Sequence, residues 1–384
     1  FVYGWFPPRN CLEWAIVTGA WMPLVLWGVE SYLVEPRARY RTVIVLAIAI
    51  QLLAGHFNLA FITLLAVFVY ATLRSISLGA CMERRIRPLL MLSCFVVLAF
   101  GVAAVQLLPS LELKNRSQRS EASFRESSLN YGNIPVWYLP QAILPWEFYP
   151  YVEGYLAGRF GDYNTNKIEA HLYFGLLPLS LAVLAMIGSR RNPFVWIWLV
   201  LGGLGLAMVT GWWTRWLGCL PGFGYFTGPG RYGVVTQFAV AVGAAVGFQG
   251  LLSRVSRIGW RVVLAICVLA CSWWDLYQVS EMVQYVSFVA TPPVSLRVKS
   301  PVASLLKPAD RVLSKNQNSI TLCGAAMLPI YLGIGPAEYF RAPTKLPDEF
   351  RWDAPMGDEV LDWLRQAGVT HVLAFEPHPD WPRK

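Results

Sequence analysis

Long apolar runs separated by short polar segments fill the first 280 residues of the chain. Because about 20 consecutive apolar residues cross the hydrocarbon layer of a membrane, the pattern predicts roughly eight membrane-spanning helices. The expected spans are Leu12–Val34, Thr42–Gly55, Asn58–Leu73, Pro88–Leu108, His171–Gly188, Pro193–Trp212, Tyr232–Leu252 and Val262–Val279. The sequence therefore predicts an all-α polytopic membrane bundle.

The stretch Thr42–Leu73 is short for two crossings, and arginine positions decide how it is interpreted. If the chain turns at Gly55–Asn58, four basic clusters fall on one side of the membrane. A single crossing would place the last three clusters opposite the first. The positive-inside rule favours the hairpin, and short spans are accommodated by local thinning and snorkelling arginines. The clusters are Arg37/Arg39/Arg41, Arg74/Arg84/Arg85/Arg87, Arg190/Arg191 and Arg254/Arg257/Arg261.

This orientation places the longer loops outside the cell. We expect a transmembrane helical domain over residues 1–280, with a long outer loop at 109–170, and an extracytoplasmic soluble α/β domain over residues 281–384. In the second domain, Arg311–Ser314 is a candidate strand. A helix at Gly357–Ala367 is followed by Gly368 as its C-cap and by a buried strand at Val369–Phe375.

Composition supports a membrane protein. The chain is 55% hydrophobic and only 14% charged, where a soluble domain carries about 25% charged residues. Its net charge of +9 could indicate a nucleic-acid partner, but the arginines sit in short loops between apolar runs, which excludes that interpretation. The chain begins at Phe1, with no signal peptide before the first apolar run, and we expect it to be a fragment that lacks N-terminal sequence.

The outer loop at 109–170 carries the densest candidate chemistry. Pro135–Phe148 is apolar and broken by prolines, so it either lies in the membrane interface or packs as a re-entrant segment. Further along are four polar candidates that could hold a general base, a cation or a phosphate. The alternative is that they only end the loop and anchor the next helix. These candidates are Arg159, Asp162, Glu169 and His171.

Two other residues are candidates on the same predicted face. His56, at the tip of the hairpin, is a base or ligand, or else it caps the turn. Arg231 follows a Gly- and Pro-rich segment, and a guanidinium at that surface suits bidentate pairing with a phosphate; its alternative role is a helix-flanking anchor. The sequence has no Walker A loop, GxSxG elbow, zinc cluster or haem motif.

Several short motifs occur in an order that resembles the bacterial YfhO-type membrane proteins. Each motif alone is weak, and the ordered set spans nearly the whole chain. The motifs are Trp21–Leu24, Leu53–His56, Gln106–Pro109 with Ser117 and Arg119, Tyr173–Leu179, Leu220–Phe223, Pro229–Arg231, Leu361–Leu364 and Gly368–Leu373.

That family looks like the GT-C class of membrane glycosyltransferases, which transfer a sugar from a polyprenyl-phosphate donor to an acceptor at the outer face. The resemblance implies a bundle of more helices than are visible here, a bacterial inner-membrane location and an acidic catalytic residue in the first outer loop. On this resemblance we expect the chain to start after that loop, so no residue is matched to the base. Phe226–Gly228 stands where a second arginine beside Arg231 is expected.

Two hypotheses follow. The first is a GT-C-like transferase, with polyprenyl-phosphate sugar and membrane lipid as partners, an envelope glycan or lipid as acceptor, and no nucleic acid. A divalent cation is compatible with it, but no ligand spacing supports a metal site. The alternative is a lipid or polysaccharide transporter or assembly factor without catalysis. A transporter is expected to have internal repeats and charged residues inside its spans. This sequence shows no repeat, and its span interiors are nearly uncharged, with Gln51 and Gln237 the main polar residues. Both observations count against a transporter. A third reading is a receptor or scaffold that uses the C-terminal domain.

Overall fold

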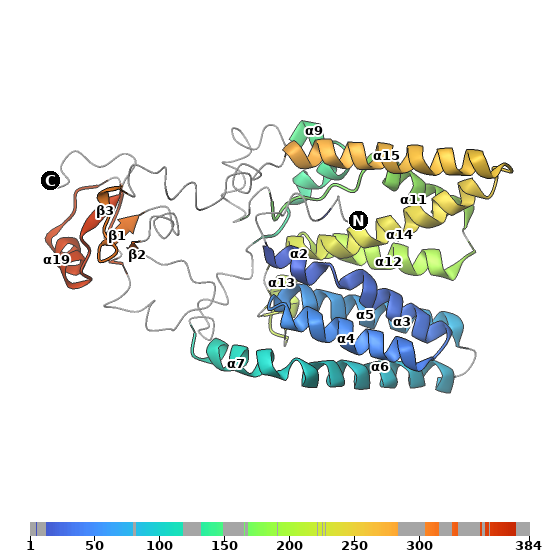
Figure 1. Ribbon diagram of the computed structural model, residues 1–384, viewed down its shortest axis with the longest axis horizontal. Helices are drawn as coiled ribbons and strands as arrows, with labels where there is room; N and C mark the ends of the chain where they lie inside the picture. Colours follow the sequence, from blue (N-terminus) through green and yellow to red (C-terminus); the bar gives the residue numbers. More distant parts are fainter. Residues whose placement is uncertain are drawn as a thin grey trace. The chain divides into compact units, whose positions relative to one another are not determined.

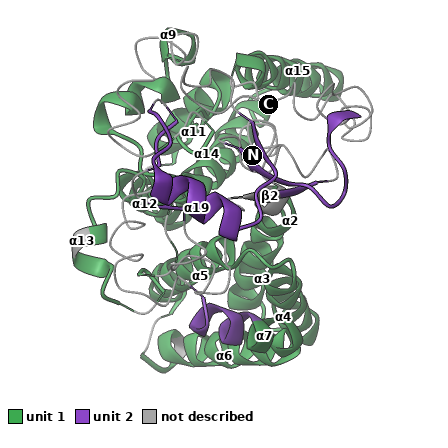
Figure 2. Cartoon of the chain, turned by 90° about the vertical axis from the view of Figure 1, so that its left-hand side faces the viewer, with its two compact units in different colours: residues 1–109, 125–286 green, residues 110–124, 287–384 purple. Residues whose placement is uncertain are grey.

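The computed structural model describes residues 5, 13–79, 82–117, 132–148, 165, 168–189, 191–220, 222–224, 226, 228–282, 304–314, 325–328, 346–347, 350–352 and 354–373. Two compact units make up the chain, and Figure 2 colours them separately. Unit 1 comprises Phe1–Pro109 and Arg125–Val286, and unit 2 comprises Ser110–Phe124 and Ser287–Lys384.

Helices account for almost all of the described part of unit 1. Every predicted span overlaps at least one of them. The long helices are α2 (Glu13–Gly19), α3 (Met22–Val34), α4 (Ala38–Leu53), α5 (Phe57–Leu78), α6 (Met82–Val102), α7 (Ala104–Asn115), α11 (Leu176–Gly188), α12 (Pro193–Met208), α14 (Gly233–Leu252) and α15 (Ile258–Met282). Short ones are η3 (Val136–Ala142), α9 (Pro145–Phe148), α13 (Thr214–Leu217) and η4 (Pro229–Tyr232).

Five helical stretches in the described residues are long and apolar enough to cross a membrane. α11 and α12 are apolar but shorter. The fold is therefore that of a helical membrane protein. The five stretches are Ile16–Val34, Phe57–Leu78, Arg85–Val102, Pro229–Leu252 and Ile258–Met282.

The predicted break between α4 and α5 is present. α4 ends at Leu53 and α5 begins at Phe57, and Gly55 in the turn has a φ of 84°, a value that glycine adopts without strain. Apart from α2–α3 and α6–α7, which each continue in one direction, successive long helices run antiparallel (Figure 1), so the connections α3–α4, α5–α6, α11–α12 and α14–α15 lie at one end of unit 1. We call this the arginine end, and we call the other end, where α11 and α14 begin, the Glu169 end.

Small residues allow α14 to pack closely against α11 and α12. A side chain at Gly247 would collide with the backbone oxygen of Leu181 in α11. On the α12 side, the Thr236 hydroxyl donates a hydrogen bond of 2.9 Å to the backbone oxygen of Gly202. Close approach through glycine and threonine is typical of helix packing inside membranes, where apolar surfaces alone provide little driving force.

Several predicted boundaries are wrong, each for a local reason. α11 begins at Leu176 instead of His171, because Gly175 has a φ of 85°, outside the helical range. The helix predicted to end at Leu108 breaks at Ala103 and continues as α7 to Asn115. Pro109 lies inside α7 and does not end it.

Unit 2 contains a parallel three-stranded sheet with strand order β2-β1-β3. The strands are β1 (Arg311–Ser314), β2 (Ala326–Leu328) and β3 (His371–Leu373), and α19 (Asp358–Gln366) packs its apolar face on Leu313. The predicted strand at Arg311–Ser314, the helix and the glycine cap, with a φ of 66° at Gly368, are all present. The strand predicted to be buried is not: His371 and Val372 in β3 are exposed.

Candidate functional site

Glu169 and Arg231, two of the predicted site residues, form an ion pair at the Glu169 end. The Nε and Nη2 atoms of Arg231 donate to the two carboxylate oxygens of Glu169, at 3.1 Å and 2.7 Å. The Glu169 side chain is 4% exposed and that of Arg231 is 14% exposed. A planar guanidinium that meets a carboxylate through two parallel bonds is among the strongest polar contacts in proteins, and burial reduces the screening that weakens surface pairs.

The backbone around Arg231 is held tightly by glycines. Gly228 has a φ of 92°, and a Cβ there would lie 2.8 Å from Arg231 Nε. The amide of Gly230 donates to the backbone oxygen of Gly132 at 2.8 Å. A side chain at Gly230 would collide with that oxygen and with the backbone oxygen of Glu169. The close packing at Gly228 and Gly230 therefore fixes the backbone beside Arg231 and, with it, the position of the guanidinium.

Glu169 lies just before a buried, non-helical segment, residues 171–175. Gln141 in η3 is fully buried and holds this backbone: its Nε2 donates to Ala170 O at 2.7 Å, and its Oε1 accepts from Leu172 N at 3.0 Å. Non-helical backbone at membrane depth is tolerated only where protein satisfies its hydrogen bonds or where it lines a water-filled cavity. The apolar segment Pro135–Phe148 thus contains η3, and one of its side chains supports the site backbone.

The far end of the same segment is fixed to α15. Tyr173 Oη donates to Asp275 Oδ1 at 2.7 Å, and Leu176 N donates to Asp275 Oδ2 at 3.0 Å. Asp275 therefore caps the N-terminus of α11, where a carboxylate interacts favourably with the helix dipole. Burial and the hydrogen bond to Asp275 raise the pKa of Tyr173, so its hydroxyl remains a donor at neutral pH.

The remaining predicted residues are distributed differently. The structure brings Glu169 and Arg231 into contact, and His171 is buried two residues after Glu169. His56 occupies the N-cap position of α5, in the turn after α4, and its side chain makes no cap hydrogen bond. Asp162 and Arg159 lie outside the described residues.

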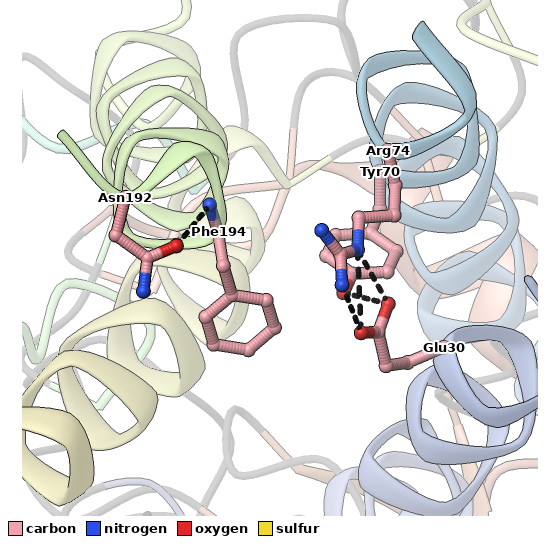
Figure 3. A network of polar contacts seen from close by, with 5 residues as sticks. All are labelled: Glu30, Tyr70, Arg74, Asn192 and Phe194. Atoms are coloured by element: carbon pink, nitrogen blue, oxygen red, sulfur yellow. Dashed lines mark hydrogen bonds and ion pairs between the residues drawn. The ribbon is translucent and has the colours of Figure 1, made fainter. Parts of the chain in front are cut away.

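A second polar network, which the sequence analysis missed, lies near the arginine end (Figure 3). Arg74 of α5 donates to Glu30 of α3 through Nε, at 3.0 Å and 3.2 Å, and through Nη2, at 2.7 Å. The Tyr70 hydroxyl donates to Glu30 Oε2 at 2.7 Å. The Arg74 guanidinium also lies 5.5 Å from the ring centre of Phe194 in α12, within the range of a cation–π contact.

This network corrects two expectations. Glu30 lies inside the apolar stretch Ile16–Val34, so the span interiors, expected to be nearly uncharged with Gln51 and Gln237 as the main polar residues, also contain a carboxylate. Arg74 was assigned to a basic loop, but α5 extends to Leu78 and the side chain is only 14% exposed. A signal was present: Tyr70 and Arg74 are four residues apart and therefore share a helix face, and Glu30 is a lone carboxylate in an apolar run.

No three His, Cys, Asp or Glu side chains gather as metal ligands within the described residues. Comparison with known proteins gives no family: no family model, no curated protein and no solved structure matches the chain. The fold is that of a helical membrane protein, and the candidate site is a buried Arg–Glu pair at one end of the bundle.

Proposed function

We propose that this chain is a GT-C-like membrane glycosyltransferase, which moves a sugar from a polyprenyl-phosphate donor to an envelope acceptor at the outer face of a bacterial inner membrane. The observation that carries the proposal is the Arg231–Glu169 pair at the Glu169 end. A guanidinium fork matches phosphate as well as carboxylate. Each of the four helix connections at the opposite end has an arginine in it or in the adjoining helix turn, and the positive-inside rule assigns that end to the cytoplasm.

In this mechanism the Glu169 carboxylate occupies the hydrogen-bond donors of Arg231 until the donor's phosphate binds. The phosphate takes over the Nε and Nη2 hydrogen bonds of Arg231 and releases the carboxylate. An acceptor hydroxyl then attacks the anomeric carbon, the bond from that carbon to the phosphate oxygen breaks, and Arg231 stabilises the charge on the departing phosphate. The hydroxyl proton passes to a carboxylate, for which Glu169 and Asp162 are the candidates. His171 is the third candidate and lies two residues after Glu169, at the start of the buried segment. A divalent cation stays compatible with this chemistry.

The test uses the full-length chain in proteoliposomes that contain a polyprenyl-phosphate sugar and an envelope extract as the acceptor. We expect free polyprenyl phosphate to accumulate. Arg231→Lys, which keeps the charge but loses the fork, should slow this release by about tenfold or more. Arg254→Lys at the arginine end is the matched control and should leave the rate unchanged. No release from any donor, or an equal rate in Arg231→Lys, refutes the proposal.

The second candidate is a lipid or polysaccharide transporter or assembly factor, and one observation favours it. Charged residues inside membrane helices often mark transport routes, and Glu30 and Arg74 are paired inside the bundle. The same proteoliposomes distinguish the two candidates. Movement of a fluorescent lipid between leaflets, without release of polyprenyl phosphate and with loss of movement in Glu30→Gln, supports transport and contradicts the transferase.

A further inference from the structure

α15 lies at the edge of unit 1 (Figure 1). Most of its apolar side chains are at least partly exposed. Only 11% of its apolar stretch is buried, compared with 39% for the stretch that contains α14. Val262, Ile266 and Leu269 are among the exposed side chains. In a helical membrane protein such a face is covered by lipid acyl chains, so its dimensions report the thickness of the hydrocarbon that it fits.

The uncharged part of α15 is short. Arg261 and Asp275 bound it, and a rise of 1.5 Å per residue separates them by about 21 Å. The neighbouring α11 has 13 residues and is therefore about 20 Å long. The hydrocarbon layer of a typical bilayer is about 30 Å thick. In contrast, α14, which packs against α11, has 20 residues and is about 30 Å long, so it does not share the short dimension of α11 and α15.

Asp275 cannot reach outward to water as a long side chain would. Its two carboxylate oxygens are held by Tyr173 Oη and Leu176 N, and aspartate has one methylene group. Arginine and lysine, by contrast, snorkel along several methylene groups. The depth of Asp275 in the membrane is therefore fixed by these hydrogen bonds. The first residue of α11, Leu176, lies at the same depth.

Aromatic side chains indicate the same level independently. Trp273, Trp274 and Tyr277 are exposed beside Asp275, and the rings of Trp273 and Tyr277 stack at 5.6 Å. Trp260 is exposed near the other end of α15, about 20 Å away from Trp273 along the axis. Tryptophan and tyrosine concentrate at the two membrane–water interfaces, so these two groups mark an aromatic belt at each surface.

The short helix α9 adds a third observation at the Asp275 level. α9 packs against α15, and Trp146 in α9 is exposed, as are the preceding Ile143 and Leu144. An apolar segment that is too short to cross and has exposed tryptophan and aliphatic side chains is suited to lie in the interface plane. The interface on this side therefore coincides with Asp275, α9 and the first turn of α11.

We propose that the α11–α15 side of unit 1 fits a hydrocarbon layer of about 20–25 Å, and that it binds short-chain lipid or thins an ordinary bilayer locally. The partner is the membrane itself, and the inference is independent of whether the chain transfers sugar. Mismatch with a thicker bilayer then places Asp275 and its hydrogen-bonding partners in hydrocarbon, which destabilises the α11–α15 contact.

The experiment is a lipid-length series. The full chain is reconstituted in phosphatidylcholines with monounsaturated chains of 14, 18 or 22 carbons, and thermal unfolding is followed by circular dichroism. We expect the highest Tm in the 14-carbon lipid and a decrease of about 5 °C in the 22-carbon lipid. A highest Tm in the 18- or 22-carbon lipid overturns the proposal. This series needs no variant, so it gives a result even if the variants fail to fold.

Two variants identify the cause. Asp275→Asn removes the charge but can still accept the Leu176 hydrogen bond, and it should at least halve the Tm difference between the 14- and 22-carbon lipids. Glu281→Gln removes a charge nearer the end of α15 and should leave the difference unchanged. An unchanged difference in Asp275→Asn shows that Asp275 does not set the fit. Because the readout is a difference between lipids, a uniform loss of stability in either variant does not affect it.

Discussion

The Glu169–Arg231 pair makes a quantitative prediction about stability that is separate from any activity. Glu169→Gln leaves the Arg231 guanidinium buried without its carboxylate, and Arg231→Gln leaves the carboxylate without its guanidinium. Removing one partner of a buried pair destabilises a protein by about 3–5 kcal/mol. The double variant carries two neutral amides that can bond to each other, so its loss should be smaller than the sum of the single losses by about 2 kcal/mol or more.

The assay is equilibrium unfolding of the full chain in mixed detergent micelles, followed by circular dichroism, for the wild type, both single variants and the double variant. The matched control is the pair of Glu112 in α7 with Arg116, the residue after the end of α7. It is an ion pair of the same chemistry at 2.8 Å whose side chains are 62% and 78% exposed. Its coupling energy should be about 0.5 kcal/mol or less.

Additive losses at Glu169 and Arg231, within about 0.5 kcal/mol, would refute the reasoning, because independent sites add and contacting sites do not. The cycle also tests the alternative that Arg231 only anchors the end of a helix. An anchor that faces the membrane surface would have no specific coupling to a residue 62 positions earlier in the chain.

Three further predictions concern the scaffold, each measured by the same unfolding assay. Glu30→Gln should lower the free energy of unfolding by about 3 kcal/mol, because the Arg74 guanidinium stays buried; a loss below about 1 kcal/mol contradicts the network. Gly247→Leu should lower it by about 2 kcal/mol by forcing α14 away from α11, whereas Gly250→Leu, with open space around it, should have little effect. Gln141→Leu should lower it by about 2 kcal/mol, since the buried backbone at 170–172 loses both bonds; wild-type stability would mean that other groups satisfy that backbone.

The order of helices and the turn at Gly55 could be predicted because both depend on local signals. Apolar runs of sufficient length form helices. The four arginine clusters fall on one side of the membrane only if the chain reverses direction inside Thr42–Leu73. The start of α11 could not be predicted in this way, since the apolar residues Leu172–Phe174 lead directly into the apolar helix that follows. The non-helical backbone of this segment depends on Gln141 and Asp275, which lie about 30 and 100 residues away in the sequence.

The site was predictable as a set of residues but not as a contact. Glu169, His171 and Arg231 are recognisable one by one as polar side chains at the edges of apolar runs, and topology places them at one end. Nothing in a single sequence indicates that Arg231 is paired with Glu169. Glu30 was missed because one carboxylate hardly changes the mean hydropathy of a long apolar run, and its partner Arg74 resembles the basic loop residues that follow α5.

The two candidate functions differ in whether Arg231 exchanges its partner, Glu169, for a phosphate. This difference distinguishes them better than the position of Arg231 does. A transferase needs the guanidinium fork for the donor's phosphate, so Glu169 has to leave it during each turnover, and a carboxylate freed inside a protein becomes a stronger base. A transporter or assembly factor needs no such exchange. The pair can then be a permanent structural ion pair that connects the segment before α11 to the start of α14. Binding of a phosphate-bearing prenyl lipid that strengthens in Glu169→Gln and weakens in Arg231→Lys would support exchange. Equal weakening in both variants would identify the contact as a permanent structural ion pair.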